Sequence, residues 1–104
     1  MKVHALDAVE DDLHRAARYY EAERSGWGCL FVDSYLRILE TVERFPQFYS
    51  LVDDGVPNLE IRNAIFDRFD YRAIYIVRPA EAVILTVTHS RRRPRHWHDR
   101  LDLA

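Results

Sequence analysis

The hydrophobic period changes halfway along the chain, and this change restricts the fold more than any other feature of the sequence. Before Pro46, apolar residues recur every three or four positions, which is the spacing of one face of a helix. After Leu59, short runs rich in Ile, Val, Tyr, Phe and Thr are separated by brief links, which is typical of neighbouring strands. The sequence therefore predicts an α+β protein with a helical first half.

The helical half divides into two helices. The first is predicted to begin at Asp7, because Glu10 follows at the spacing of an acidic capping box. A break at Gly26–Gly28 separates it from the second helix. Pro46 ends that second helix, since proline disfavours helical geometry at the preceding residue and cannot donate to the ladder. Two helices joined by so short a break form an αα-hairpin.

The remaining elements are strands and a short tail. Strands are predicted at residues 2–6, 59–66, 71–78 and 83–88, with a loop at 46–57 and a C-terminal helical tail at 95–100. The last three strands have links that allow only antiparallel neighbours. The predicted order is β-α-α-β-β-β, with the helix pair on one face of an antiparallel sheet and the other face left open. We expect a single domain over residues 1–104, because 48% of the residues are hydrophobic and no linker interrupts them.

Charge and cysteine content restrict the compartment and the partners. The only cysteine is Cys29, so the sequence contains no disulfide framework. Residues 1–7 lack the apolar run of a signal peptide, and no stretch is long enough to span a membrane, so we expect a cytoplasmic protein. The net charge of −2 is uninformative, but the last residues form a basic end. This end contains Arg91, Arg92, Arg93, Arg95 and Arg100.

Several motifs occur in a fixed order along the chain. They are Asp12-Leu13, Ala17-Arg18-Tyr19-Tyr20-Glu21, Gly26-Trp27-Gly28 with Phe31, Phe45-Pro46, Arg68-Phe69-Asp70-Tyr71-Arg72 with Tyr75, and Thr88-His89-Ser90-Arg91-Arg92-Arg93-Pro94 with Trp97 and Arg100. This ordered set resembles the RelE/ParE toxins over essentially the whole chain. The resemblance implies the β-α-α-β-β-β fold that the periodicity also predicts. It further implies the toxin of a type II toxin–antitoxin system, without a cofactor, which forms a hetero-oligomer with a cognate antitoxin.

The superfamily that the chain resembles has two functional branches. RelE-like members are ribosome-dependent endoribonucleases, whereas ParE-like members act on DNA gyrase. Cleavage of RNA by its 2′-hydroxyl needs a base, an acid and cations on the phosphate. RelE-like toxins are expected to supply these groups from two lysines and an arginine on the first sheet strands, an arginine after the last strand and a tyrosine near the C-terminus.

This chain matches only part of the RelE-like set. Arg72 and Arg91 match the two arginines and are the candidate catalytic residues of an RNase. The lysines are missing, with Asn63 and Ile65 near their positions, and Trp97 replaces the tyrosine. An indole nitrogen is a donor only and cannot transfer protons near neutral pH. The residues therefore favour a protein that binds and does not catalyse, and the resemblance to the ParE-like branch implies that it inhibits DNA gyrase. An RNase and a non-toxic antitoxin-binding module remain alternatives.

The candidate binding residues are arginines and one tryptophan. They are Arg62, Arg68, Arg72, Arg91, Arg92, Arg93 and Trp97, for contact with the target or with the antitoxin. Direct binding of nucleic acid is not expected. Trp97 either anchors the tail on the sheet, the reading that we favour, or contacts the target.

Other residues with reactive side chains are predicted to have structural roles. The histidines His89, His96 and His98 resemble a metal site, but this region contains no cysteine. His89 also matches the pattern of the RelE/ParE toxins that the chain resembles, in which no metal is expected. We therefore predict no metal and a structural role for His89 at the strand end. Cys29 is predicted to be a small buried or half-buried hydrophobic residue. Tyr71 and Tyr75 are predicted to share one strand face in the core.

Overall fold

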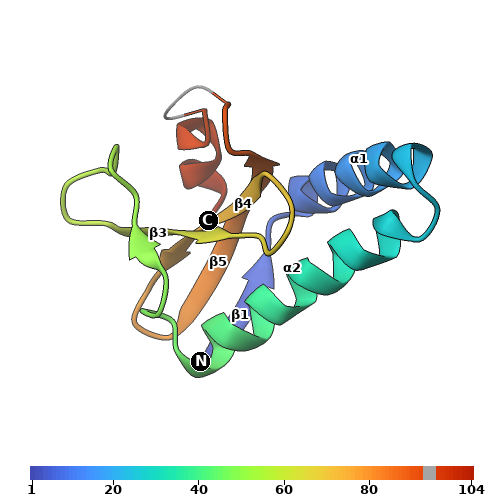
Figure 1. Cartoon of the computed structure of the whole chain (residues 1–104). Coiled ribbons are helices and arrows are strands. Elements are labelled where there is room, and N and C mark those ends of the chain that lie inside the picture. Colours follow the sequence, from blue (N-terminus) through green and yellow to red (C-terminus); the bar gives the residue numbers. More distant parts are fainter. Residues whose placement is uncertain (93–95) are drawn as a thin grey trace.

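Two helices followed by strands form one α+β structure in the computed structural model, which describes residues 1–92 and 96–104 (Figure 1). The elements are β1 (Lys2–Ala5), α1 (Asp7–Glu23), α2 (Trp27–Arg44), β2 (Ser50–Leu51), β3 (Glu60–Ile65), β4 (Tyr71–Val77), β5 (Glu81–His89) and the 3-10 helix η1 (His98–Leu103). The predicted order is confirmed. The short strand β2 is an addition within the predicted loop, and β5 is longer than predicted.

The five strands form a mixed sheet in the order β1-β5-β4-β3-β2. The pairs β3/β4 and β4/β5 are antiparallel, as predicted, and the additional pair β2/β3 is antiparallel as well. The first strand pairs with β5 in parallel, so the prediction of an antiparallel sheet is wrong for β1. No short link constrains this pair, because both helices and three strands lie between β1 and β5, and such a long crossover permits parallel pairing.

The helix pair covers one face of the sheet. Figure 1 shows α1 and α2 running side by side, with the turn between them extending beyond the sheet. Their apolar stripes pack on the strand residues that point toward them. This first core cluster includes Val9, Ala16, Phe31, Tyr35, Ile38, Val42, Ala64, Phe66, Phe69, Ala73, Tyr75 and Ile84. Tyr71 packs at its margin, so the prediction that Tyr71 and Tyr75 share a core face is confirmed.

The opposite face of the sheet carries a second core cluster. It contains Val52, Ile61, Ile74, Ile76, Val83, Leu85 and Trp97, with Leu101 and Ala104 packed against it. Trp97, Leu101 and Ala104 belong to the C-terminal segment, which therefore docks on the sheet. The prediction of an open second face is wrong where the C-terminal segment packs on the sheet. Alternate strand residues on that face are also apolar, and the segment buries them.

The helix ends explain several sequence motifs. The N-cap of α1 is Leu6, which makes no side-chain cap, so the predicted capping box is absent and Asp7 and Glu10 instead lie in the first turn. There they interact favourably with the helix dipole. At the start of α2, Gly26 adopts φ 90° and its backbone N–H donates to the Glu21 carboxylate. Among the described residues, no helix is long and apolar enough to cross a membrane.

Candidate functional site

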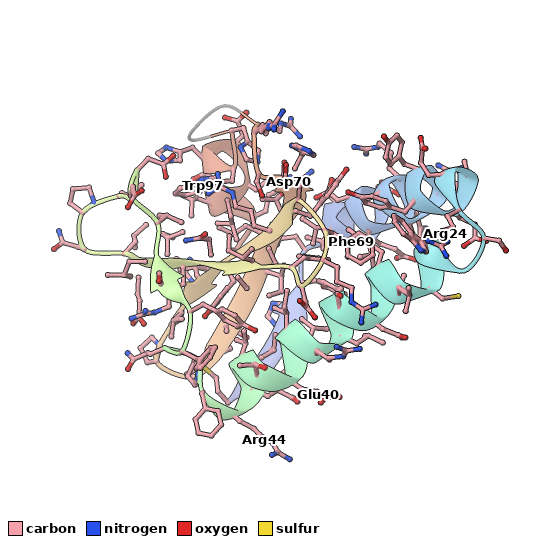
Figure 2. All side chains as sticks on the ribbon, in the orientation of Figure 1. Arg24, Glu40, Arg44, Phe69, Asp70 and Trp97 are labelled. Carbon is pink, nitrogen blue, oxygen red and sulfur yellow. The ribbon has the colours of Figure 1, made fainter. Side chains whose placement is uncertain are left out.

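A cationic surface lies at the end of the sheet where the β3–β4 turn meets the end of β5. The backbone N–H of Ser90 donates to the carbonyl oxygen of Asp70 at 2.9 Å, which joins the two segments. The turn presents exposed Arg68, and the residues after β5 present exposed Arg91 and Arg92. Figure 2 shows Asp70 at this end of the sheet. The structure therefore brings three of the predicted arginines to one end of the molecule.

Asp70 and His89 organise this surface. The Asp70 carboxylate lies 3.5 Å from His89 Nε2 and 3.8 Å from Arg91 Nε. His89 Nδ1 accepts a hydrogen bond from the backbone N–H of Arg91 at 3.1 Å. The predicted structural role of His89 at the strand end is therefore confirmed. The Arg91 side chain is 87% exposed, so its ion pair with Asp70 is weak and leaves the guanidinium available to a partner.

Arg72 lies near the same end but on the other face of the sheet from the helices. It is in register with Ile65 of β3 and Thr88 of β5, so these three side chains form a row across the sheet. Arg72 is half-buried, and its Nε is buried without a hydrogen-bond partner among the described residues. A buried unsatisfied donor is costly, and it is satisfied by water or by an incoming acceptor.

Arg62 is separated from the other predicted arginines. It faces the helices with Tyr75, its register partner on β4. Its guanidinium donates to Glu60 Oε2 at 2.8 Å and to the carbonyl oxygen of Tyr49 at 2.6 Å. Arg62 thus holds the segment before β2 against β3. Arg93, also predicted as a binding residue, lies outside the described residues.

Trp97 is buried completely, with 0% of its surface exposed. Its ring packs in the second core cluster and lies 4.2 Å from the ring of His98, centroid to centroid. The favoured reading of Trp97 as an anchor of the tail is therefore confirmed. Direct contact of this ring with a partner would require the tail to leave the sheet.

The sequence reading missed a buried ion pair between Asp12 of α1 and Arg100 of η1. Arg100 Nη1 donates to Asp12 Oδ2 at 2.6 Å and Nη2 donates to Oδ1 at 3.2 Å. The same carboxylate accepts from Thr86 Oγ1 at 3.1 Å and from the backbone N–H of Val87 at 3.2 Å. An acid among the apolar residues of the α1 face was the available signal. Its partner, 88 residues away, could not be assigned from spacing.

A bulge in β5 explains why Arg100 reaches this position. Ile74 pairs with Thr86 and Tyr75 with Ile84, so Leu85 is an extra residue without a register partner. A bulge leaves backbone groups of the extra residue unpaired. Arg100 Nη1 donates to the Leu85 carbonyl oxygen at 2.9 Å and so satisfies it.

The αα-hairpin carries a groove of about 920 Å³ between α1 and α2. Cys29 lines this groove and is exposed, so its predicted burial is wrong. The reason is that the preceding residue, Gly28, occupies the closest approach to α1 and turns Cys29 outward. In the part of the chain that the structure describes, no three His, Cys, Asp or Glu side chains are grouped to hold a metal ion.

Four tyrosines have a raised pKa, with burial as the largest cause: Tyr20, Tyr35, Tyr71 and Tyr75. Burial raises the pKa of Tyr35 and of Tyr75 to about 12. These hydroxyls are therefore protonated near neutral pH and act as donors, not as bases. The chemistry that the described arginines offer at the cationic surface is the binding of anionic groups.

The comparisons with known proteins agree with this architecture. No family model matches the sequence, and no curated protein matches it. Among solved structures, a chain of the chromosomal ParDE toxin–antitoxin system from P. aeruginosa is similar, with a TM-score of 0.71 and 16% sequence identity. The match covers 86% of this chain and 95% of that chain. At this identity the likeness concerns the fold, and the protein therefore has the ParE-like fold that its sequence motifs implied.

Proposed function

We propose that this protein is the toxin of a type II toxin–antitoxin pair and that it inhibits DNA gyrase by binding. The observation that carries the proposal is the fold, which matches a chain of a ParDE toxin–antitoxin system over 86% of this chain. The ordered motifs of the sequence support the same assignment. A cognate antitoxin holds the toxin inactive, and its loss releases the cationic surface for the target.

The face that bears Arg72 supports binding over catalysis. In register with Arg72, the strands place Ile65 and Thr88, and the neighbouring row contains Asn63. Arginine and threonine can hold a phosphate, but neither is a proton-transfer group near neutral pH. The position of the RelE-like tyrosine holds the buried ring of Trp97. These residues lack an evident acid–base pair, and an RNase is therefore the weaker reading.

Induction of the protein in a bacterial host tests the proposal. We expect growth arrest that co-expression of a cognate antitoxin reverses. We also expect DNA breaks trapped on gyrase, measured by plasmid linearisation with purified gyrase, and intact mRNA by primer extension. Cuts at codon positions would establish the RNase alternative instead. Normal growth would favour the alternative that the protein is a non-toxic antitoxin-binding module.

Substitution of the exposed Arg91 after β5 tests whether this residue contacts the target, with a matched control on α2. Arg91→Ala removes a guanidinium that is 87% exposed and weakly paired, so the fold should persist. We expect at least a tenfold lower gyrase inhibition, because one lost contact to a charged group costs about 1.5–3 kcal/mol. The control is Arg37→Ala, which removes an exposed arginine from α2. Equal inhibition by the two variants would exclude Arg91 from the target surface.

A further inference from the structure

A small cavity lies between α1, the start of β4 and the end of β5, behind the cationic surface. Its volume is about 130 Å³. Residues from four segments line it, and the polar ones among them are Asp12, Arg15, Tyr71, Thr88, His89 and Arg92. Residues 77 positions apart thus meet in one pocket, which is a product of the fold and not of a local motif.

The cavity has an excess of positive charge. Within residues 1–92 and 96–104, Arg15 and Arg92 make no ion pair. The carboxylate of the cavity, Asp12, is already saturated, since it accepts two bonds from Arg100 and one each from Thr86 and the backbone of Val87. The charges of Asp12 and Arg100 cancel each other. Among the described residues, no ion pair offsets the charges of Arg15 and Arg92.

Asp70 is a second carboxylate near this cavity, and it faces His89. It lies 3.5 Å from His89 Nε2 and 3.8 Å from Arg91 Nε. Its charge is therefore directed to the outer side, where Arg91 lies, and it forms no ion pair with Arg15 or Arg92 among the described residues. A carboxylate inserted into the cavity would supply a counter-charge to these two arginines.

A neutral donor completes the lining. Tyr71 is half-buried at the edge of the first core cluster. Burial raises the pKa of Tyr71 while the charge of Arg15 lowers it, so the hydroxyl stays protonated near neutral pH and Arg15 lies within electrostatic reach of it. A hydroxyl donor beside two guanidinium groups forms a lining suited to an anionic oxygen pair.

We propose that this cavity binds the side-chain carboxylate of an acidic residue from a protein partner, with Arg15 and Arg92 as its cationic ligands. The inference rests on the proposed function only for the partner's identity, which is the antitoxin. A volume of 130 Å³ equals that of roughly four waters, at about 30 Å³ each, so it holds a carboxylate but not a nucleotide.

An NMR titration of the whole protein tests the pocket without a partner. The probes are glutamate blocked at both ends as N-acetyl-glutamate amide, the corresponding blocked glutamine, and inorganic phosphate, all at constant ionic strength. The readout is the set of arginine Nε–Hε signals, assigned with the variants below. We expect blocked glutamate to shift the signals of Arg15 and Arg92, and blocked glutamine to leave them in place.

Single substitutions then locate the site. Arg15→Gln and Arg92→Gln change exposed side chains and should each abolish the response of the remaining arginine. Arg18→Gln, one turn further along α1, is the matched control and should retain it. A response to phosphate without one to blocked glutamate would overturn the proposal in favour of a phosphate-bearing ligand. No response to either probe, or equal responses in all three variants, would also overturn it.

The antitoxin complex provides the second arm. We expect Arg15→Gln to raise the Kd for the antitoxin about tenfold or more, the loss of one charge-assisted contact. Unchanged affinity in this variant would overturn the pocket as the antitoxin contact. Failure of the unmodified protein to bind any antitoxin would instead contradict the proposed function, and the result with blocked glutamate would still decide the pocket.

Discussion

Single residues at the turn between the helices explain why the Gly-Trp-Gly motif occurs there. The Glu21 carboxylate accepts hydrogen bonds from the backbone N–H groups of Gly26 and Gly28 at 3.1 and 3.0 Å. These are free amide groups at the start of α2, and an acidic side chain satisfies them and favours the helix dipole. A Cβ on Gly28 would lie 2.9 Å from the Ala17 carbonyl oxygen. The motif is therefore structural and holds the two helices in contact.

A methyl group at this contact should be costly. We expect Gly28→Ala to lower the free energy of unfolding by about 1–3 kcal/mol, because backbone atoms of α1 must move away from it. The matched control is Gly55→Ala, whose Cβ would lie at an ordinary 3.4 Å from Val52 Cγ2. Urea denaturation compares the two variants. A loss of the same size at both positions would show that close helix packing does not require Gly28.

Buried tyrosines give the protein an alkaline limit. Burial raises the pKa of Tyr75 from 10.0 to about 12, so the folded chain keeps a proton that the unfolded chain loses above pH 10. The stability is complete below pH 10 and falls as the pH rises toward 12, by at most about 1.4 kcal/mol per pH unit for each such group. The same sign holds for Tyr35, whose pKa is also about 12.

Tyr75→Phe separates the ionisation from the hydrogen bond. The variant loses the bond from the hydroxyl to the Pro46 carbonyl oxygen at 2.7 Å, which should cost about 1 kcal/mol at pH 7. Between pH 10 and 12 its stability should fall less steeply than that of the unmodified protein. Urea midpoints across this range provide the measurement. Parallel curves for both proteins would rule out Tyr75 as a source of the alkaline loss.

The candidate site was only partly predictable at this scale. The exposed arginines after β5 follow from a charge run, and the structure brings Arg68 to the same end. Arg62 was misleading, because a sequence does not show that carbonyl oxygens of a distant loop occupy its guanidinium. Arg15 was missed, since on a helix surface it resembles any solvated charge. Only the fold places it in a cavity with Arg92.

Among the elements, local pattern predicted helices and antiparallel strands, and non-local contacts decided the rest. Both helices and the strands β3, β4 and β5 have strong periodicity and short links. The two-residue strand β2 has no pattern of its own and exists because its residues pair with Asn63 and Arg62. The parallel placement of β1 depends on β5, which comes about 75 residues later. The docking of η1 depends on Trp97 and on the Leu85 bulge.

The contact between α1 and η1 should fasten the tail to the sheet. Asp12 has a side chain only 5% exposed, and Arg100 one 26% exposed. Removing one partner of a buried ion pair leaves the other charge buried and unpaired, which lowers the free energy of unfolding by about 3–5 kcal/mol. We therefore expect Arg100→Met, which keeps the apolar stem, to destabilise the protein by about this amount, with the solvent exposure of Arg100 placing it at the lower end.

Tryptophan fluorescence checks whether the tail itself is released. In a Trp27→Phe background, Trp97 is the single tryptophan, and its emission should shift to longer wavelength in the Arg100→Met variant under native conditions. Arg44→Met, at the exposed end of α2, is the control and should leave the emission unchanged. An unshifted spectrum in a destabilised variant would mean that Trp97 alone keeps the tail in place.

At the scale of the whole molecule, the sheet separates two apolar layers that depend on each other. The helix pair supplies one layer and the C-terminal segment the other, and the Asp12–Arg100 pair crosses between them at the β5 edge. The cationic surface lies where these layers meet, between the β3–β4 turn and the residues after β5. Its geometry is therefore a property of the complete fold.

The pairing of β1 with β5 also sets when this fold can form. During translation, β1 and α1 emerge first, yet their partners are in the last strand and in η1, and Arg100 comes 88 positions after Asp12. Contacts of such separation form only after the intervening chain is available. Nearly all of residues 1–104 must therefore leave the ribosome before the cationic surface exists, so a nascent chain that is still incomplete lacks this surface.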